Sequence, residues 1–166
     1  MAVATEASRR SWAKGNAAQE WWAAWHQAKF GRSLEGTPVP NFKEWDYKDS
    51  ANGCTYEVKY DERASDTGNI CFELHGEGRG ATGLMGSTAT WLVFLVPESA
   101  EQVRVIYLKR VIALQTFFNA LETGIPLGKF VKVAWAGDCI AHCWLVPEYL
   151  VHELMNTNTF TGEVEK

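Results

Sequence analysis

Residues 54–61 constrain the fold of this chain more than any other segment, because they alternate strictly between two kinds of side chain. One face of a strand here would carry Cys54, Tyr56, Val58 and Tyr60, and the opposite face would carry Thr55, Glu57, Lys59 and Asp61. Alternation with a period of two is typical of a β-strand that packs one face against a core. The turn-forming residues 50–53 precede this segment and residues 44–49 also alternate, so we expect a β-hairpin.

The predicted hairpin brings acidic and basic side chains to one face. If residues 50–53 form the loop, Asp46 lies directly opposite Glu57. If only the last two of these residues form the turn, Asp46 faces Lys59 instead. Both registers leave Asp46, Glu57 and Lys59 on the same face, because the registers differ by two residues. The alternative interpretation is a solvated strand face on which the charges gather by chance.

The two carboxylates favour a bound cation. Opposed acidic side chains destabilise a sheet unless a positive charge lies between them. Oxygen ligands suit hard divalent ions, so we expect Mg²⁺ or Mn²⁺ at Asp46 and Glu57. Lys59 can orient or deprotonate a water molecule beside that ion. The combination is typical of metal-assisted hydrolysis of a phosphodiester.

Apolar periodicity elsewhere predicts helices that alternate with strands. From about Gly15 the spacing predicts a helix that ends at Gly31. Its apolar stripe comprises Ala18, Trp21, Trp22, Trp25 and Ala28. Further strands are expected at residues 70–74, 91–96, 102–108, 130–135 and 142–146, and further helices at 84–89, 109–121 and after Pro147. The expected fold class is α/β, a mixed β-sheet flanked by helices in a single domain of residues 1–166, with residues 1–14 loosely ordered.

Composition excludes several classes of protein. Hydrophobic residues make up 46% of the chain and charged residues 22%, as in globular domains. The longest apolar run, residues 91–96, is far shorter than the ~20 residues that a membrane span needs. The first ten residues lack the apolar core of a secretory signal, so we expect a cytoplasmic protein with no membrane partner. The formal net charge of −4 argues against coating of nucleic acid through a basic field, but not against a local grip on phosphates.

Other motifs carry weaker signals. Cys139, His142, Cys143 and His152 match no common zinc spacing, so we expect reduced cysteines and no zinc. A small zinc-stabilised structural domain would instead contain stoichiometric zinc. The glycine-rich segment 76–80 lacks the ending of a phosphate-binding loop, and its Arg79 is either a contact to a DNA phosphate or part of a plain mobile loop.

These residues together resemble the PD-(D/E)XK nuclease superfamily. The resemblance is carried by an acidic residue on the first helix, then Asp46, then Glu57-Val58-Lys59. More narrowly, residues 56–61, followed by Thr67-Gly68-Asn69 and Glu73, are similar to small phage and prophage nucleases of the Holliday-junction-resolvase-like group. The resemblance extends over most of the chain and implies a restriction-endonuclease-like sheet.

The resemblance also implies roles for individual residues. Asp46 and Glu57 would be metal ligands, helped by the main-chain carbonyl of Val58. Lys59 would position or activate the attacking water. Glu20 matches the acidic residue that such enzymes place on the first helix, where it completes the metal shell through water. Less defined secondary roles fall on Asp61, Asn69 and Glu73.

The chain departs from the family pattern at a few positions. Trp45 replaces the proline that gives the family its name, which matters little because proline binds no metal. Thr90 stands where the resemblance leads us to expect an aspartate, so a secondary role there is in doubt. Asp49 competes with Asp46 as the first ligand, but the period of two places Asp49 on the opposite face.

The implied activity is that of a metal-dependent DNA endonuclease of phage type, acting on branched DNA in the host cytoplasm. One alternative is a restriction-type or DNA-degrading nuclease of the same fold, which would share every catalytic residue. Another is a catalytically silent domain that binds DNA or a protein. We expect a homodimer, because two copies supply two sites and a longer groove. Its interface would include Trp21, Trp22 and Trp25, which exceed what one core stripe needs.

Overall fold

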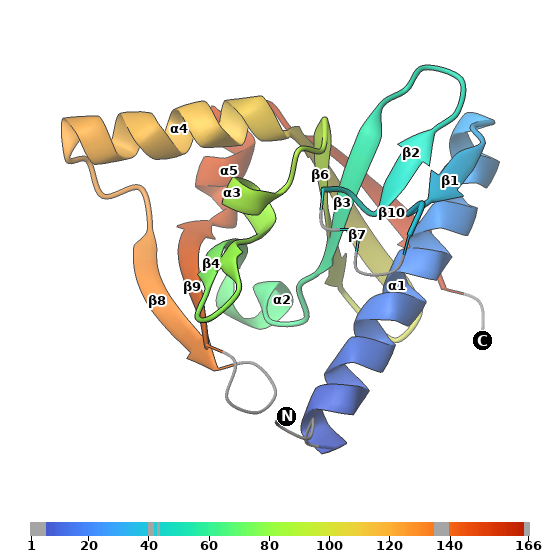
Figure 1. Cartoon of the computed structure of the whole chain (residues 1–166), viewed down its shortest axis with the longest axis horizontal. Helices are drawn as coiled ribbons and strands as arrows, with labels where there is room; N and C mark the ends of the chain where they lie inside the picture. The colour runs from blue at the N-terminus through green and yellow to red at the C-terminus, as the bar shows by residue number, and fades with distance from the viewer. Residues whose placement is uncertain (1–5, 40–41, 43, 135–139, 165–166) are drawn as a thin grey trace.

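Two β-sheets form the framework of the structure, a computed structural model that describes residues 6–39, 42, 44–134 and 140–164 (Figure 1). The helices are α1 (Glu6–Phe30), α2 (Ala64–Thr67), α3 (Gly83–Gly86), α4 (Arg110–Thr123) and α5 (Glu148–Leu154). The strands are β1 (Leu34–Gly36), β2 (Tyr47–Asp49), β3 (Thr55–Tyr60), β4 (Asn69–Gly76), β5 (Gly80–Ala81), β6 (Trp91–Pro97), β7 (Gln102–Lys109), β8 (Lys129–Ala134), β9 (Ile140–Pro147) and β10 (Asn158–Glu163). The predicted α/β class, with a mixed sheet flanked by helices, is confirmed.

The larger sheet is mixed and the smaller sheet is antiparallel. The six-stranded sheet has the order β1-β2-β3-β6-β7-β10, and only the β3–β6 pair among its neighbours is parallel in the part of the chain described. The four-stranded sheet has the order β5-β4-β9-β8. Its separation from the first sheet was not predicted, because the β4–β9 pairing joins segments far apart in the sequence.

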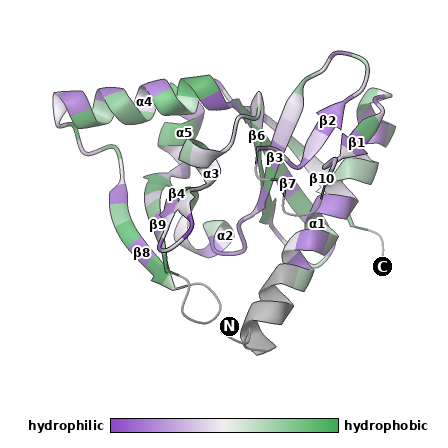
Figure 2. Ribbon diagram, viewed as in Figure 1, coloured by the Kyte–Doolittle hydropathy of each residue, from purple (hydrophilic) through white to green (hydrophobic). Residues whose placement is uncertain are grey.

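Strand β6 separates two apolar cores. Its residues Val93 and Leu95 pack with Trp22 and Val58 beneath α1. Its alternate residues point into the other core, which contains Leu92, Phe94, Val96, Phe72, Trp144, Ile106 and Phe117. A strand buried on both faces reads as a continuous apolar run, as Figure 2 shows along β6.

Helix α1 begins at Glu6, earlier than predicted, and ends before Gly31, whose φ of +61° suits a glycine cap. Its tryptophans exceed one core stripe because β10 packs against them. A Cβ atom on Gly162 would lie 2.6 Å from Cη2 of Trp21 and 3.0 Å from Nε1 of Trp25. The apparent surplus of tryptophan is therefore used within the chain, and the homodimer stays a prediction without this argument.

Element boundaries differ modestly from those predicted. The first strand of the hairpin begins at Tyr47 instead of residue 44, and β1 is a short strand that was not predicted. Strand β10 was not predicted, because it follows the C-terminal helix in a polar stretch. None of the described helices combines the length and the apolar character needed to cross a membrane.

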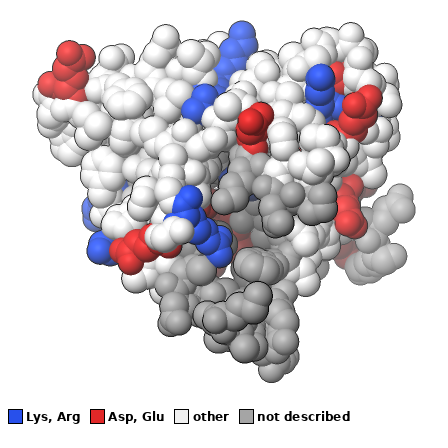
Figure 3. Space-filling model, in the orientation of Figure 1, with Lys and Arg blue, Asp and Glu red and all other residues white. Residues whose placement is uncertain are grey.

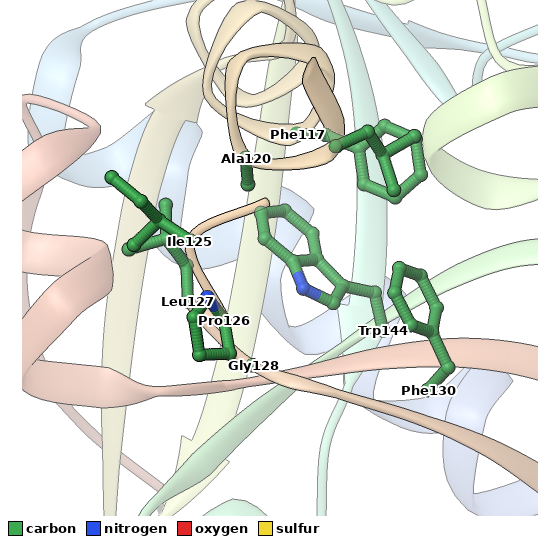
Figure 4. A pocket seen from close by; sticks show the side chains of 9 residues that line it. Phe117, Ala120, Ile125, Pro126, Leu127, Gly128, Phe130 and Trp144 are labelled. Carbon is green, nitrogen blue, oxygen red and sulfur yellow. The ribbon is translucent and has the colours of Figure 1, made fainter. Parts of the chain in front are cut away.

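An apolar surface lies between α4 and β8, where Phe118, Leu121, Ile125 and Phe130 are each more than half exposed. A small hollow of about 40 Å³ opens within it beside Trp144 (Figure 4). The residues lining it carry no charged side chain, so it offers no chemistry for a polar substrate.

Candidate active site

The β2–β3 hairpin adopts the first of the two predicted registers. Tyr47 pairs with Tyr56 and Lys48 with Thr55. The regular pairing ends at Tyr47, and the N–H of Asp46 bonds to the carbonyl of Tyr56, next to Glu57. Residues 50–53 form the loop, which is closed by the hydrogen bond from the Asp49 amide to the Cys54 carbonyl (2.8 Å). The alternative register, in which Asp46 faces Lys59, is wrong.

Asp46, which directly precedes β2, forms hydrogen bonds to β3 through both its main chain and its side chain. Its main-chain N–H donates to the Tyr56 carbonyl at 2.8 Å. Its carboxylate oxygen Oδ2 accepts the main-chain N–H of Val58 at 2.7 Å. The Asp46 carboxylate is therefore fixed against the middle of β3 by a charge-assisted hydrogen bond.

Glu57 and Lys59 form an ion pair on the same face of β3, with 2.6 Å between Nζ and Oε1. Glu57 is only 7% exposed, so this is not a solvated strand face. In the parallel β3–β6 register, the apolar residues Leu92 and Phe94 stand beside the pair. Charged groups persist in such surroundings only when they are paired, and these are.

Burial and mutual repulsion shape the protonation of the two carboxylates. Burial first, and then the charge of Glu57, raise the pKa of Asp46 to about 6, against the opposing effects of Lys59 and the Val58 N–H. Burial lowers the pKa of Lys59, but the charges of Glu57, Asp46 and Glu73 outweigh it and leave that pKa above its ordinary value. Lys59 is therefore protonated at neutral pH and can donate hydrogen bonds, which favours the positioning role over the activating one.

Gln19 of α1 was missed in the sequence, and it contacts the centre of this site. Its Nε2 lies 3.0 Å from the main-chain oxygen of Val58 and 3.4 Å from Oδ2 of Asp46. One donor atom reaches both oxygens, so these two acceptors converge on a single point. A signal was present, because residue 19 lies one helical turn before Trp22, on the side of α1 that packs on the sheet.

Glu20, the residue expected to complete the metal shell, is exposed at the next position. Its charge is felt at Tyr47, whose pKa is raised by burial, then by Asp46 and by Glu20. No contact of Glu20 with Asp46 or Glu57 is found among the described residues, and its role through water stays a prediction. The same part of the chain contains no group of three or more His, Cys, Asp or Glu side chains arranged around a common point.

Of the three residues with predicted secondary roles, Asp61 and Asn69 bond to the main chain of neighbouring segments, and Glu73 lies near the site. Asp61 accepts the N–H groups of Ala64 (3.1 Å) and Cys71 (3.0 Å), which ties the end of β3 to α2 and β4. Asn69 donates its side-chain N–H to the carbonyl of Thr67 at 2.9 Å and thereby shapes the turn before β4. Of the three, only Glu73 acts on the site, through its charge on Lys59.

Asp49, the competitor of Asp46, and Thr90, which departs from the family pattern, both have structural roles. Asp49 is fully buried on the opposite face, as predicted, and its Oδ1 accepts the N–H of Ala51 at 2.8 Å. Thr90 and Thr55 bond reciprocally: the Thr90 N–H donates to Oγ1 of Thr55 (3.0 Å), and the Thr55 N–H donates to Oγ1 of Thr90 (3.3 Å). Thr90 thus joins β3 to the start of β6.

Basic side chains near the site are few. Arg110 at the start of α4 is close enough for the charge of Glu57 to act on its pKa, which burial lowers overall. Arg79 lies in the exposed turn between β4 and β5, so a contact to DNA there stays a prediction. Figure 3 shows positive and negative side chains interspersed, with no continuous basic surface among the described residues on that face.

No protein-family model, no curated protein and no solved structure matches this chain. The resemblance to PD-(D/E)XK nucleases therefore rests on its motif residues alone.

Cys139, one member of the cysteine–histidine group, lies outside the described residues. Cys71 and Cys143 are free thiols on neighbouring strands, and neither takes part in a disulfide.

Proposed function

We propose that this chain is a metal-dependent DNA endonuclease that hydrolyses phosphodiester bonds. The observation that carries the proposal is the convergence of Oδ2 of Asp46 and the carbonyl oxygen of Val58 on one point, beside the Glu57–Lys59 ion pair. Oxygen atoms that converge in this way on a buried strand suit a hard divalent cation. The same atoms would be out of place on a surface that only solvates the strand.

The residues present fit Mg²⁺ or Mn²⁺. Asp46, the Val58 carbonyl and Glu57 would hold the ion, whose charge would offset the burial and the repulsion by Glu57 that raise the pKa of Asp46. Gln19 would give up its hydrogen bonds to these oxygens when the ion binds. Once bound, the ion would supply the positive charge that polarises the phosphodiester and lowers the pKa of a water molecule.

The protein side chains would orient the reaction. Lys59 presents a protonated ammonium group that can donate to the attacking water or to a phosphate oxygen and stabilise developing negative charge. Glu57 holds Lys59 in place through the 2.6 Å ion pair. The charges of Glu57 and Asp46, with a smaller contribution from Glu73, raise the pKa of Lys59 against the effect of burial. The substrate we propose is DNA, with branched DNA preferred and a homodimer as the acting species.

The test is cleavage of supercoiled plasmid and of a synthetic four-way junction with Mg²⁺, Mn²⁺ or EDTA. Lys59→Ala should abolish metal-dependent cutting, whereas Lys48→Ala, an exposed lysine on the neighbouring strand, should leave it unchanged. Preference for the junction over linear duplex would support the branched substrate, and the reverse would favour a restriction-type or DNA-degrading enzyme. Equal cutting by Lys59→Ala would remove Lys59 and its strand face from the catalytic machinery, and no cutting of either substrate would reject the hydrolytic function and favour a domain that only binds.

A further inference from the structure

A second concave site lies on the other face of the six-stranded sheet, at the C-terminal end of α1. It is an open pocket of about 370 Å³, within the range of about 300–1,000 Å³ typical of small-molecule sites. Because β3 alternates, its Tyr56 lines this pocket while Glu57 faces the acidic site. The two sites are therefore separate, and each can be occupied without the other.

Aromatic rings form the walls of this pocket. Tyr56, Trp91, Phe30, Tyr107 and Phe160 all line it. Their rings pack edge to face, as in the Phe30–Phe160 pair (5.5 Å between centroids) and the Tyr107–Phe160 pair (5.8 Å). Walls of this kind accept a flat ring, which gains stacking and edge contacts on several sides.

Cationic side chains surround the same rings. Arg32 lines the pocket, and its Nε lies 3.8 Å from Oδ2 of the buried Asp49. Lys29 Nζ lies 5.1 Å from the centroid of the Phe160 ring, and Lys109 Nζ lies 5.7 Å from that of Trp91. A ring bound between these aromatics would therefore have positive charge within reach of a negatively charged substituent.

Polar groups able to contact a ring edge are also present. The Trp22 indole N–H donates to the Tyr107 hydroxyl (2.8 Å), and this hydroxyl also forms a hydrogen bond with Nδ1 of His26 (2.7 Å). The other ring nitrogen of His26, Nε2, is buried and lacks a partner among the described residues. Asn52 and Asn158 add carboxamides to the lining, a group suited to the edges of nucleobases.

We propose that this pocket binds a nucleotide unit, with the base among the aromatic rings and the phosphate at Arg32, Lys29 and Lys109. The unit comes either from a free nucleotide or from an unpaired position of a nucleic-acid strand, because both present a flat ring joined to a phosphate. Stacking of bases on aromatic side chains tolerates any sequence, because every base has a flat π-face. The site does not depend on the hydrolytic function proposed above.

Binding is tested by calorimetry in EDTA, with 5′-dAMP, deoxyadenosine, inorganic phosphate and a short oligothymidylate as probes. We expect saturable binding of 5′-dAMP, with deoxyadenosine weaker by about tenfold because the ion pairs are missing. Arg32→Gln should weaken 5′-dAMP by a similar factor and leave deoxyadenosine unchanged. The matched control is Arg63→Gln, an exposed arginine outside the pocket, which should bind as the wild type does.

A second measurement, protection of a cysteine thiol, uses the wild-type protein and therefore does not require any variant to fold. Cys54 lines the pocket, and bound nucleotide should slow alkylation of its thiol, as followed by peptide mass mapping. Tighter binding of the oligothymidylate than of the mononucleotide would identify a strand as the source, and equal binding would identify a free nucleotide. Absence of saturable binding at millimolar probe together with unprotected Cys54, or binding unaffected by Arg32→Gln, would overturn the proposal.

Discussion

The side-chain nitrogen of Gln19 lies 3.0 Å from the main-chain oxygen of Val58, a contact that joins α1 to β3 at the centre of the acidic site. The same nitrogen reaches the Asp46 carboxylate at 3.4 Å. An amide N–H carries a partial positive charge, so it adds a donor between these two oxygens, beside the Val58 N–H that Oδ2 of Asp46 already accepts. Gln19 is thus a competitor for the position that a cation would take.

Removal of this competitor should strengthen metal binding. We expect Gln19→Ala to lower the Mn²⁺ concentration needed for half-maximal binding by about two- to fivefold, since one weak hydrogen bond per oxygen no longer has to break. Isothermal calorimetry with Mn²⁺ measures the effect. Gln115→Ala, at an exposed position of α4, serves as the control and should bind Mn²⁺ as the wild type does. Weaker binding by Gln19→Ala would show instead that Gln19 supports the ion.

Asp46 should have opposite effects with and without metal. Burial and the charge of Glu57 oppose its ionisation, so Asp46→Asn should raise the melting temperature in EDTA. Mn²⁺ should raise the melting temperature of the wild type but not that of Asp46→Asn, because the variant loses a metal ligand. Thermal unfolding followed by circular dichroism gives both numbers, with Asp66→Asn in α2 as an exposed control. An equal Mn²⁺ shift in Asp46→Asn would remove Asp46 from the ligand set.

Asp61 should matter for stability and not for catalysis. Its carboxylate accepts the N–H groups of Ala64 and Cys71, and Asp61→Ala would leave both donors without this partner. The free energy of unfolding should fall by about 1–3 kcal/mol, as measured by urea denaturation. Cleavage per folded molecule should be unchanged. Loss of cleavage in a folded Asp61→Ala protein would support the secondary role that the family resemblance implies.

The packing of α1 on β10 can be tested at a glycine. Gly162→Ala would place a Cβ atom 2.6 Å from Cη2 of Trp21 and close to Trp25, so one or both indoles must move. We expect a loss of about 1–3 kcal/mol in the free energy of unfolding. Gly36→Ala is the matched control, because its Cβ would meet no atom within 4 Å. Equal stabilities would mean that α1 and β10 adjust without cost.

Local periodicity was sufficient to predict the hairpin but not the contacts made across it. The alternation of residues 54–61 and the turn residues before it predict the hairpin but leave two registers open, and the structure selects the one that pairs Tyr47 with Tyr56. Glu57 is buried beside Leu92 of β6 and the second core, a neighbourhood that exists only when distant strands pair. The contact of Gln19 depends on how α1 docks against β3, and no local pattern encodes a docking angle.

Strand β10 is a second example of structure that local sequence patterns do not predict. Its residues 158–163 are mostly polar and alternate little, so no local pattern predicts a β-strand there. Pairing with β7 and packing beneath Trp21 and Trp25 stabilise it instead. The excess of tryptophan in α1 was the one visible sign of this partner, and from the sequence alone it indicated a contact with a second copy, which stays a prediction.

His26 should make stability depend on pH in a defined direction. It is 4% exposed among aromatic rings, and burial, with a smaller contribution from Arg32, lowers its pKa from 6.5 to about 4 against the effect of Asp49. A folded-state pKa below the unfolded one gives stability that is fully present above pH 6.5 and is lost as the pH falls toward about 4. The loss over this window should be about 3 kcal/mol, because the unfolded chain binds a proton that the folded chain refuses. Urea denaturation across this range measures how steeply the free energy of unfolding falls with pH, and this fall should be shallower for His26→Phe than for the wild type. The control His75→Asn, at an exposed position, should retain the wild-type pH dependence. The same pH dependence in His26→Phe and the wild type would exclude His26 as its source.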